Sequence, residues 1–110
     1  RNGVSAMQRS QAIAQTYAIV DAMRANVASA RAGAYNLALP SSGCSIPSAG
    51  SSLASKDLNR WRKSFLDTMG DGPCGGVSCA AGVCEITIRW NDEAGSGGST
   101  SQVLRTRVRP

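Results

Sequence analysis

Histidine is absent from this chain of 110 residues, and aromatic residues make up only 5% of it. Histidine is the commonest metal ligand in proteins and a frequent general base, so its absence removes the usual residue for both roles. The sequence also lacks a nucleophile-elbow motif, a glycine-rich phosphate loop and the C-x-x-C redox motif. We therefore expect no enzymatic activity, no metal or other cofactor, and no small-molecule substrate.

The sequence also has no apolar run near the ~18 residues that a membrane-spanning helix needs, and it begins at Arg1 rather than at methionine. We expect a processed or truncated chain. Acidic residues are scarce, because the chain has 7 Asp and Glu against 12 Lys and Arg, which gives a net charge of +5. A basic balance suits an anionic partner such as nucleic acid or a membrane surface, or it serves solubility alone.

The local group of positive charges is Arg105, Arg107 and Arg109, which an extended strand would place on one face. These side chains could contact phosphates of a nucleic acid. Alternatively, they form a solvent-facing side of a sheet that discourages edge aggregation. We favour the second interpretation.

Four cysteines are present in a chain rich in glycine and serine: Cys44, Cys74, Cys79 and Cys84. An even count in such a short chain favours disulfides and an oxidising compartment. Zinc is the alternative, but the C-x4-C-x4-C spacing is looser than that of a zinc knuckle, and histidine is lacking. Four cysteines allow three pairings, which the sequence does not decide. Our working expectation joins Cys74 to Cys79 and Cys44 to Cys84.

Residues 1–31 predict a long helix, with the strongest pattern from residue 4 onward, because alanine is plentiful there. Its expected core face, taken at 100° per residue, comprises Ile13, Thr16, Val20, Met23 and Val27. The opposite face is small and nearly uncharged, and carries Met7, Gln11, Ala14, Ala18, Ala22 and Ala25. Alanine there is either a good helix former and nothing more, or part of a face that another helix packs against closely.

Residues 32–83 form an expected connecting region, in which "LPSSGCSIPSAGSS" is a loop and residues 56–68 are a short helix. Ser55 is its expected N-cap, and Leu58, Trp61 and Phe65 its buried face. Residues 84–110 predict a β-hairpin, from "CEITIRW" and "VLRTRVR", that packs on the first helix. The pattern also allows a further short strand near residues 77–83. The expected fold is a single α+β domain over residues 1–110.

Three segments resemble a known family in the same order and cover roughly half the chain. "RSQAIAQTYAIVDAMRANVASARAGAY" resembles the first helix of type IV pilus minor pilins of the PilV type, with its Asp-x-Met-Arg-Ala-Asn motif and subsequent Gly-Ala-Tyr. "DLNRWRKSF" resembles the family's Asp-Leu-x-x-Trp-Arg helix, and "CEITIRWND" its Thr-Ile-x-Trp-Asx strand. Val27 stands where the family often has proline, so the helix is expected to continue past Asn26.

The resemblance implies a type IV pilin-like fold and a non-catalytic subunit that helps to prime pilus assembly and sits at the pilus tip. The family's processing signature and membrane-spanning half-helix do not occur in this sequence. We therefore expect the periplasmic part of a protein that is anchored in the inner membrane before assembly and later reaches the extracellular pilus tip. Expected partners are other minor pilins, a large tip-associated protein and the major pilin. The small-residue face would then contact neighbouring subunits.

Other functions stay open at this point. A minor pseudopilin of type II secretion shares the implied fold and differs in its partners. A pilin that binds DNA for uptake would use the +5 charge and the row of arginines. A secreted, disulfide-rich inhibitor or binding module would work alone as a monomer.

Overall fold

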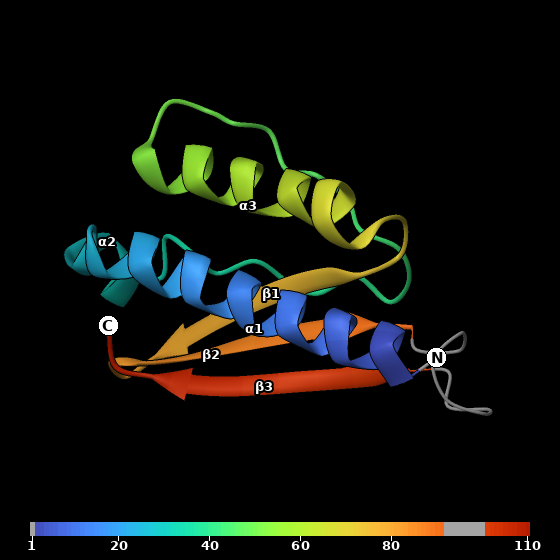
Figure 1. Ribbon diagram of the computed structural model, residues 1–110. Helices are drawn as coiled ribbons and strands as arrows, with labels where there is room; N and C mark the ends of the chain where they lie inside the picture. The colour runs from blue at the N-terminus through green and yellow to red at the C-terminus, as the bar shows by residue number, and fades with distance from the viewer. Residues whose placement is uncertain (1, 92–100) are drawn as a thin grey trace.

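The computed structural model describes residues 2–91 and 101–110 of the chain. Its elements in order are α1 (Asn2–Arg24), α2 (Val27–Arg31), α3 (Leu53–Met69), β1 (Cys74–Ala80), β2 (Val83–Trp90) and β3 (Gln102–Val108). The strands form an antiparallel sheet in the order β1-β2-β3. Figure 1 shows α1 and α3 on the same side of this sheet. The predicted α+β class is confirmed.

The sheet contains the predicted hairpin together with a third strand. β2 pairs with β3, and the alternation expected for β2 is confirmed because Ile86, Ile88 and Trp90 are at most 2% exposed. β1 pairs with the other side of β2 through a turn at Ala81 and Gly82, whose φ angles are both positive, at 53° and 80°. Positive φ at two successive turn residues is typical of a type I′ turn, which matches the twist of a hairpin.

α1 buries a different arc from the predicted one. Ile13 and Val27, which were expected in the core, are 42% and 37% exposed. Among residues 6–31, the buried ones are Ala12, Gln15, Thr16, Ile19, Val20, Met23 and Ala30. At 100° per residue, this arc is turned by about 50° from the predicted one. The reason is α3, which packs along one flank of α1, so that α1 is buried against two neighbours rather than against the sheet alone.

The first helix also ends earlier than expected. Asn26 has φ −142° and ψ 52°, which interrupts the helical backbone between α1 and α2 without any proline. Asparagine is a poor helix former, and the Asn26 side-chain amide donates a hydrogen bond of 3.2 Å to the hydroxyl of Tyr35. The expectation that the helix continues past Asn26 is therefore wrong, because a tertiary contact competes with the helical backbone at this position.

α3 begins three residues before the predicted start. Ser52 is the N-cap, since its hydroxyl accepts a hydrogen bond of 3.1 Å from the backbone N–H of Ser55. Ser55, the expected cap, instead lies inside the first turn. The predicted buried face of this helix is confirmed, because Leu58, Trp61 and Phe65 are all buried.

Two disulfides are present, between Cys44 and Cys74 and between Cys79 and Cys84. The pairing expected from the sequence is wrong. Cys74 and Cys79 lie five residues apart on β1, which separates their Cα atoms by about 16 Å along a strand, beyond the reach of a disulfide. Cys79 and Cys84 face each other across the β1–β2 hairpin, with Cα atoms 4.0 Å apart. Two disulfides are compatible with an extracytoplasmic domain.

Candidate subunit interface

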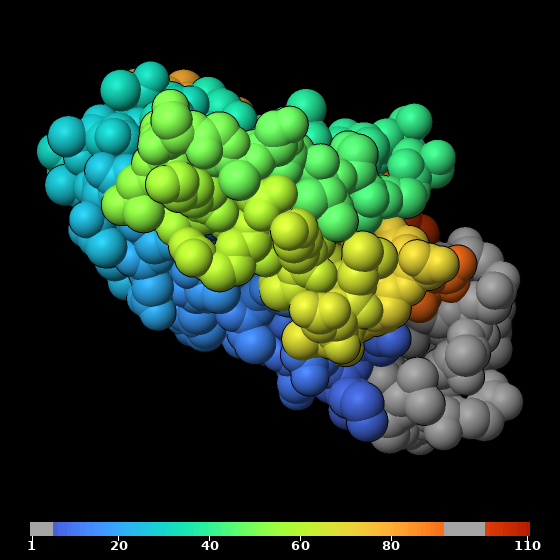
Figure 2. All heavy atoms as spheres, turned by 90° about the horizontal axis from the view of Figure 1, so that it is seen from above, coloured from blue at the N-terminus to red at the C-terminus, as the bar shows by residue number. Residues whose placement is uncertain are grey.

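One face of α1 is left uncovered by both the sheet and α3. We call it the α1 ridge and define it by Met7, Ala14, Tyr17, Ala18, Asp21 and Ala25, all of which are exposed. Met7 and Tyr17 are each 63% exposed. Figure 2 shows α1, in blue, running openly along one side of α3. Three of its six residues are alanines, and Asp21 is its one charged residue.

The small-residue face predicted from the sequence largely coincides with this ridge. Met7, Ala14, Ala18 and Ala25 lie on it, whereas Gln11 and Ala22 are only partly exposed. Ala22 packs against the core on the α3 side. Gln15 is buried on the α3 side. Its polar atoms have partners there, because Ser64 donates to its side-chain oxygen at 3.0 Å and its amide donates to Thr68 at 3.1 Å.

Two shallow hollows flank the α1 ridge. On the α3 side, a hollow of about 190 Å³ lies between Ala18, Ala22 and the α3 residues Arg60, Trp61 and Ser64. On the sheet side, a groove of about 220 Å³ lies between α1 and β3. Ala18 and Ala22 leave space in the hollow on the α3 side, whereas the groove on the sheet side is lined on α1 by larger side chains such as Ile13 and Tyr17.

A buried hydrogen-bond network fixes the C-terminal end of α1 against α3. The Tyr35 hydroxyl is fully buried and donates a hydrogen bond of 2.5 Å to the Asp57 carboxylate. Asp57 also accepts a hydrogen bond of 2.6 Å from Arg60, and Asn26 donates to the Tyr35 hydroxyl. Burial raises the pKa of Tyr35, and the hydrogen bond to Asp57 raises it further. The network joins the α1–α2 junction, the segment after α2, and α3.

Arg62 was named from the sequence only as a residue of the Asp-Leu-x-x-Trp-Arg resemblance, and its burial was not predicted. Its side chain is 1% exposed and donates to the backbone carbonyls of Ala38 and Ser45 at 2.7 Å and of Gly75 at 2.8 Å. Burial lowers the pKa of Arg62, and the charge of nearby Arg89 contributes as well. A signal was available, because Arg62 follows Leu58 by four residues on the buried face of α3. This guanidinium fastens the segment before α3 to β1.

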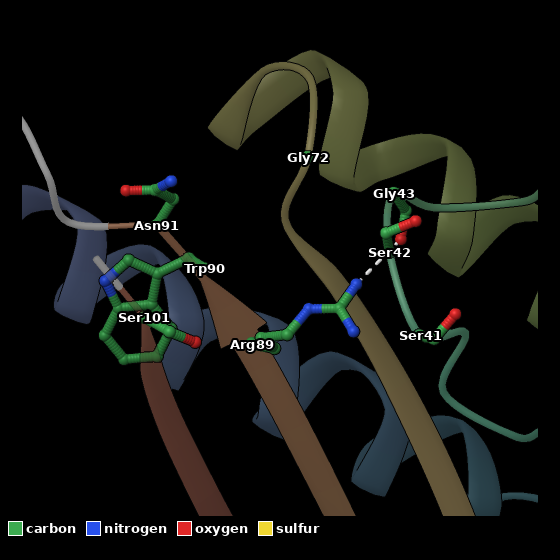
Figure 3. Close-up of a pocket in the computed structure, with 8 residues that line it drawn as sticks. All are labelled: Ser41, Ser42, Gly43, Gly72, Arg89, Trp90, Asn91 and Ser101. Carbon is green, nitrogen blue, oxygen red and sulfur yellow. Dashed lines mark hydrogen bonds between the residues drawn. The ribbon is translucent and has the colours of Figure 1, made fainter.

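A further hollow, with a volume of about 340 Å³, lies at the end of β2. Figure 3 shows its lining residues, which are Ser41, Ser42, Gly43, Gly72, Arg89, Trp90, Asn91 and Ser101. The Arg89 guanidinium does not point freely into this space. It donates to the carbonyl of Pro40 and, at 2.8 Å, to that of Gly43. Arg89 therefore anchors the segment of residues 40–43, much as Arg62 anchors its neighbours.

The row of arginines lies on the face of the sheet that turns away from the helices. Arg105 and Arg107 are exposed on β3, and Arg109 is exposed just after it. Their neighbours on β2 differ, because Arg105 pairs with Thr87 and Arg107 pairs with Glu85. The carboxylate of Glu85 thus offsets part of the positive charge of the row.

The described residues hold no group of three or more metal-binding side chains, and no helix among them combines the length and apolar content needed to cross a membrane. No protein-family model matches the chain, and neither a curated protein nor a solved structure matches it. The family resemblance therefore depends on the three sequence segments alone.

Proposed function

We propose that this chain is a non-catalytic minor pilin subunit that packs against other pilins through the α1 ridge. The observation that carries the proposal is the two-sided character of α1. One side packs on the chain's own sheet and on α3, while the other is exposed and holds three alanines, two large apolar side chains and one charged residue. Alanines at Ala14, Ala18 and Ala25 allow a second helix to approach at the short end of the usual 8–10 Å range.

The residues that carry the family resemblance support a pilin-like fold for a separate reason. Asn26, Tyr35 and Asp57 belong to one hydrogen-bond network, in which Asn26 and Tyr35 come from the first segment of the resemblance and Asp57 from the second. Trp61 is buried and donates a hydrogen bond of 2.9 Å to the Gln15 carbonyl, which ties α3 to α1. Together with Arg62, these residues maintain the architecture that presents the α1 ridge, so their shared presence suits a common fold.

The proposal includes location and partners. We propose an extracytoplasmic domain that is anchored in the inner membrane before assembly and is then placed at the pilus tip. There it would contact other minor pilins, the major pilin and a large tip-associated protein. A minor pseudopilin of type II secretion would use the same ridge with different partners.

Binding to DNA is the second candidate, and one observation weakens it. Glu85 lies opposite Arg107 in the sheet, so a phosphate backbone following the arginines would approach a carboxylate at that position. Repulsion from this carboxylate would offset contacts to the adjacent arginine. We therefore rank assembly through the α1 ridge first.

A pull-down with the periplasmic domains of other minor pilins tests the proposal. Ala14→Glu combined with Ala18→Glu places two charges on the ridge and should weaken binding about tenfold or more. Ala49→Glu combined with Ala80→Glu is the matched control, since both alanines are exposed and lie outside α1, in the loop before α3 and on β1. Equal binding by the two double variants would contradict the proposal. Capture of pseudopilin domains alone would favour the secretion-system alternative.

A further inference from the structure

The layer of side chains between the sheet and α1 is incomplete at β3. On β2 the residues that face the helices are fully buried, since Ile86 and Ile88 are 0% exposed. Their partners across the strand pair, Thr106 and Leu104, are only partly buried, as is Val108. β3 is the last strand of the sheet, and no further strand of the described residues pairs with it. The core therefore opens to solvent along this edge.

An apolar groove runs along the open edge. It has a volume of about 220 Å³ and lies between α1 and β3. Ile13 and Tyr17 form its outer wall on α1 and are 42% and 63% exposed, while Leu104 and Val108 line it from β3. Ile13 was expected in the core, and its exposure here follows from the turned arc of α1. The groove thus combines unburied apolar side chains with the unpaired edge of a strand.

The charges beside the groove specify what would fit. A strand added to β3 would alternate its side chains between the two faces of the sheet. One set would enter the apolar groove, and the other would lie on the outer face, next to Arg105 and Arg107. Acidic side chains on that outer set would form favourable cross-strand pairs with the arginines. An alternating apolar and acidic strand is therefore complementary to both faces of β3.

A second copy of this chain is a poor occupant. Antiparallel pairing of β3 with β3 of another copy would place the two arginine rows against each other, which like-charge repulsion disfavours. Arginines on an edge strand hinder pairing with a strand of like charge. They do not hinder a strand that carries carboxylates, and the inward residues of β3, Leu104, Thr106 and Val108, are uncharged.

We propose that β3 and its groove form a docking site for an extended segment of a partner protein, in which apolar and acidic residues alternate. The segment adds to the free edge of β3, its apolar side chains fill the groove beside Ile13 and Tyr17, and its carboxylates pair with Arg105 and Arg107. This site stands on the edge, the groove and the charges, and it is separate from the role proposed for the α1 ridge.

The test uses a fluorescent peptide with alternating valine and glutamate, as long as the seven residues of β3. Titration of the full chain by fluorescence anisotropy measures its affinity, and amide hydrogen exchange by NMR locates it. We expect slower exchange in β3. N-methylation of alternate peptide residues along one peptide edge should abolish binding, and methylation along the other edge should not, because only one edge bonds to β3.

Two pairs of protein variants test the side-chain contacts. Arg105→Glu with Arg107→Glu should weaken binding about tenfold or more, whereas Lys56→Glu with Lys63→Glu makes the same charge change on exposed α3 positions and should not. Ile13→Asp, at a groove residue that is 42% exposed, should weaken binding, and Leu66→Asp, at an apolar site on α3 that is 41% exposed, should not.

Three results would overturn the proposal. One is the absence of peptide binding. Another is equal binding of a peptide with the same composition but with its valines and glutamates in separate blocks. The third is binding of a single-stranded oligonucleotide in place of the peptide, lost in Arg105→Glu with Arg107→Glu, which would assign the arginines to a nucleic acid.

Discussion

Replacement of Arg62 by alanine should destabilise this protein more than any other substitution of a charged residue among those described. The guanidinium is 1% exposed and donates to three backbone carbonyls that belong to two separate segments. Alanine would remove all three hydrogen bonds and leave the carbonyl of Gly75, on a buried strand residue, without its donor.

The magnitude follows from these contacts. A hydrogen bond from a charged group contributes about 1.5–3 kcal/mol, and a buried acceptor left unpaired costs about 1–3 kcal/mol. Ala38 and Ser45 are exposed residues. Water can therefore hydrogen-bond to their carbonyls once the Arg62 side chain is removed. We therefore expect a total loss of about 3–5 kcal/mol, most of it from the buried end of the network. A domain of this size has only about 5–15 kcal/mol of stability in total.

Urea unfolding followed by tryptophan fluorescence, with both disulfides intact, measures the loss. Arg62→Lys should lie between wild type and Arg62→Ala, because it keeps the charge but not the planar set of donors. It also serves if the alanine variant fails to fold. Arg60→Ala is the control, since Arg60 pairs with Asp57 but is 71% exposed, and its loss should cost at most about 1 kcal/mol. Equal losses for Arg62→Ala and Arg60→Ala would refute the reasoning.

Three further predictions concern Tyr35, Ala81 and the tryptophans. Because burial raises the pKa of Tyr35 in the folded chain, its stabilising effect is complete below about pH 10 and is lost as pH rises toward the folded pKa. Urea unfolding between about pH 8 and 11 should show this loss, and Tyr35→Phe should lack it. Ala81→Asn should stabilise by about 1 kcal/mol, since Ala81 has a positive φ, and an unchanged melting temperature would contradict this. Trp61→Ala and Trp90→Ala should each cost about 3–5 kcal/mol, and near-wild-type melting of both would show that their burial is misplaced.

The two proposed surfaces are neighbours on the molecule, because Tyr17 belongs to the α1 ridge and also lines the groove beside β3. A helix packed on the ridge near Ala14 and Ala18 and a strand added to β3 would meet at this side chain. Occupation of one surface would therefore affect the other. The charge change at Arg105 and Arg107 alters the strand site alone, so it separates the two binding events.

The sequence alone determined the local elements whose signals lie within a few residues. Period-two alternation located β2 and β3, because each apolar side chain needs only its own strand to set its direction. Helical spacing identified the buried face of α3 through Leu58, Trp61 and Phe65. The alanines at positions 14, 18 and 25 marked part of the exposed face of α1, although Tyr17 on the same face was not among the residues expected there.

Only the tertiary structure decided which partners the elements meet. The buried arc of α1 depends on α3, which no periodicity within α1 can reveal, so Ile13 was assigned to the core and Gln15 was not. The disulfide pairing depends on strand register, which brings Cys79 to Cys84 and separates Cys74 from Cys79. Arg62 is buried because carbonyls from distant segments converge on it. In each case the deciding energy comes from a contact between residues far apart in the chain.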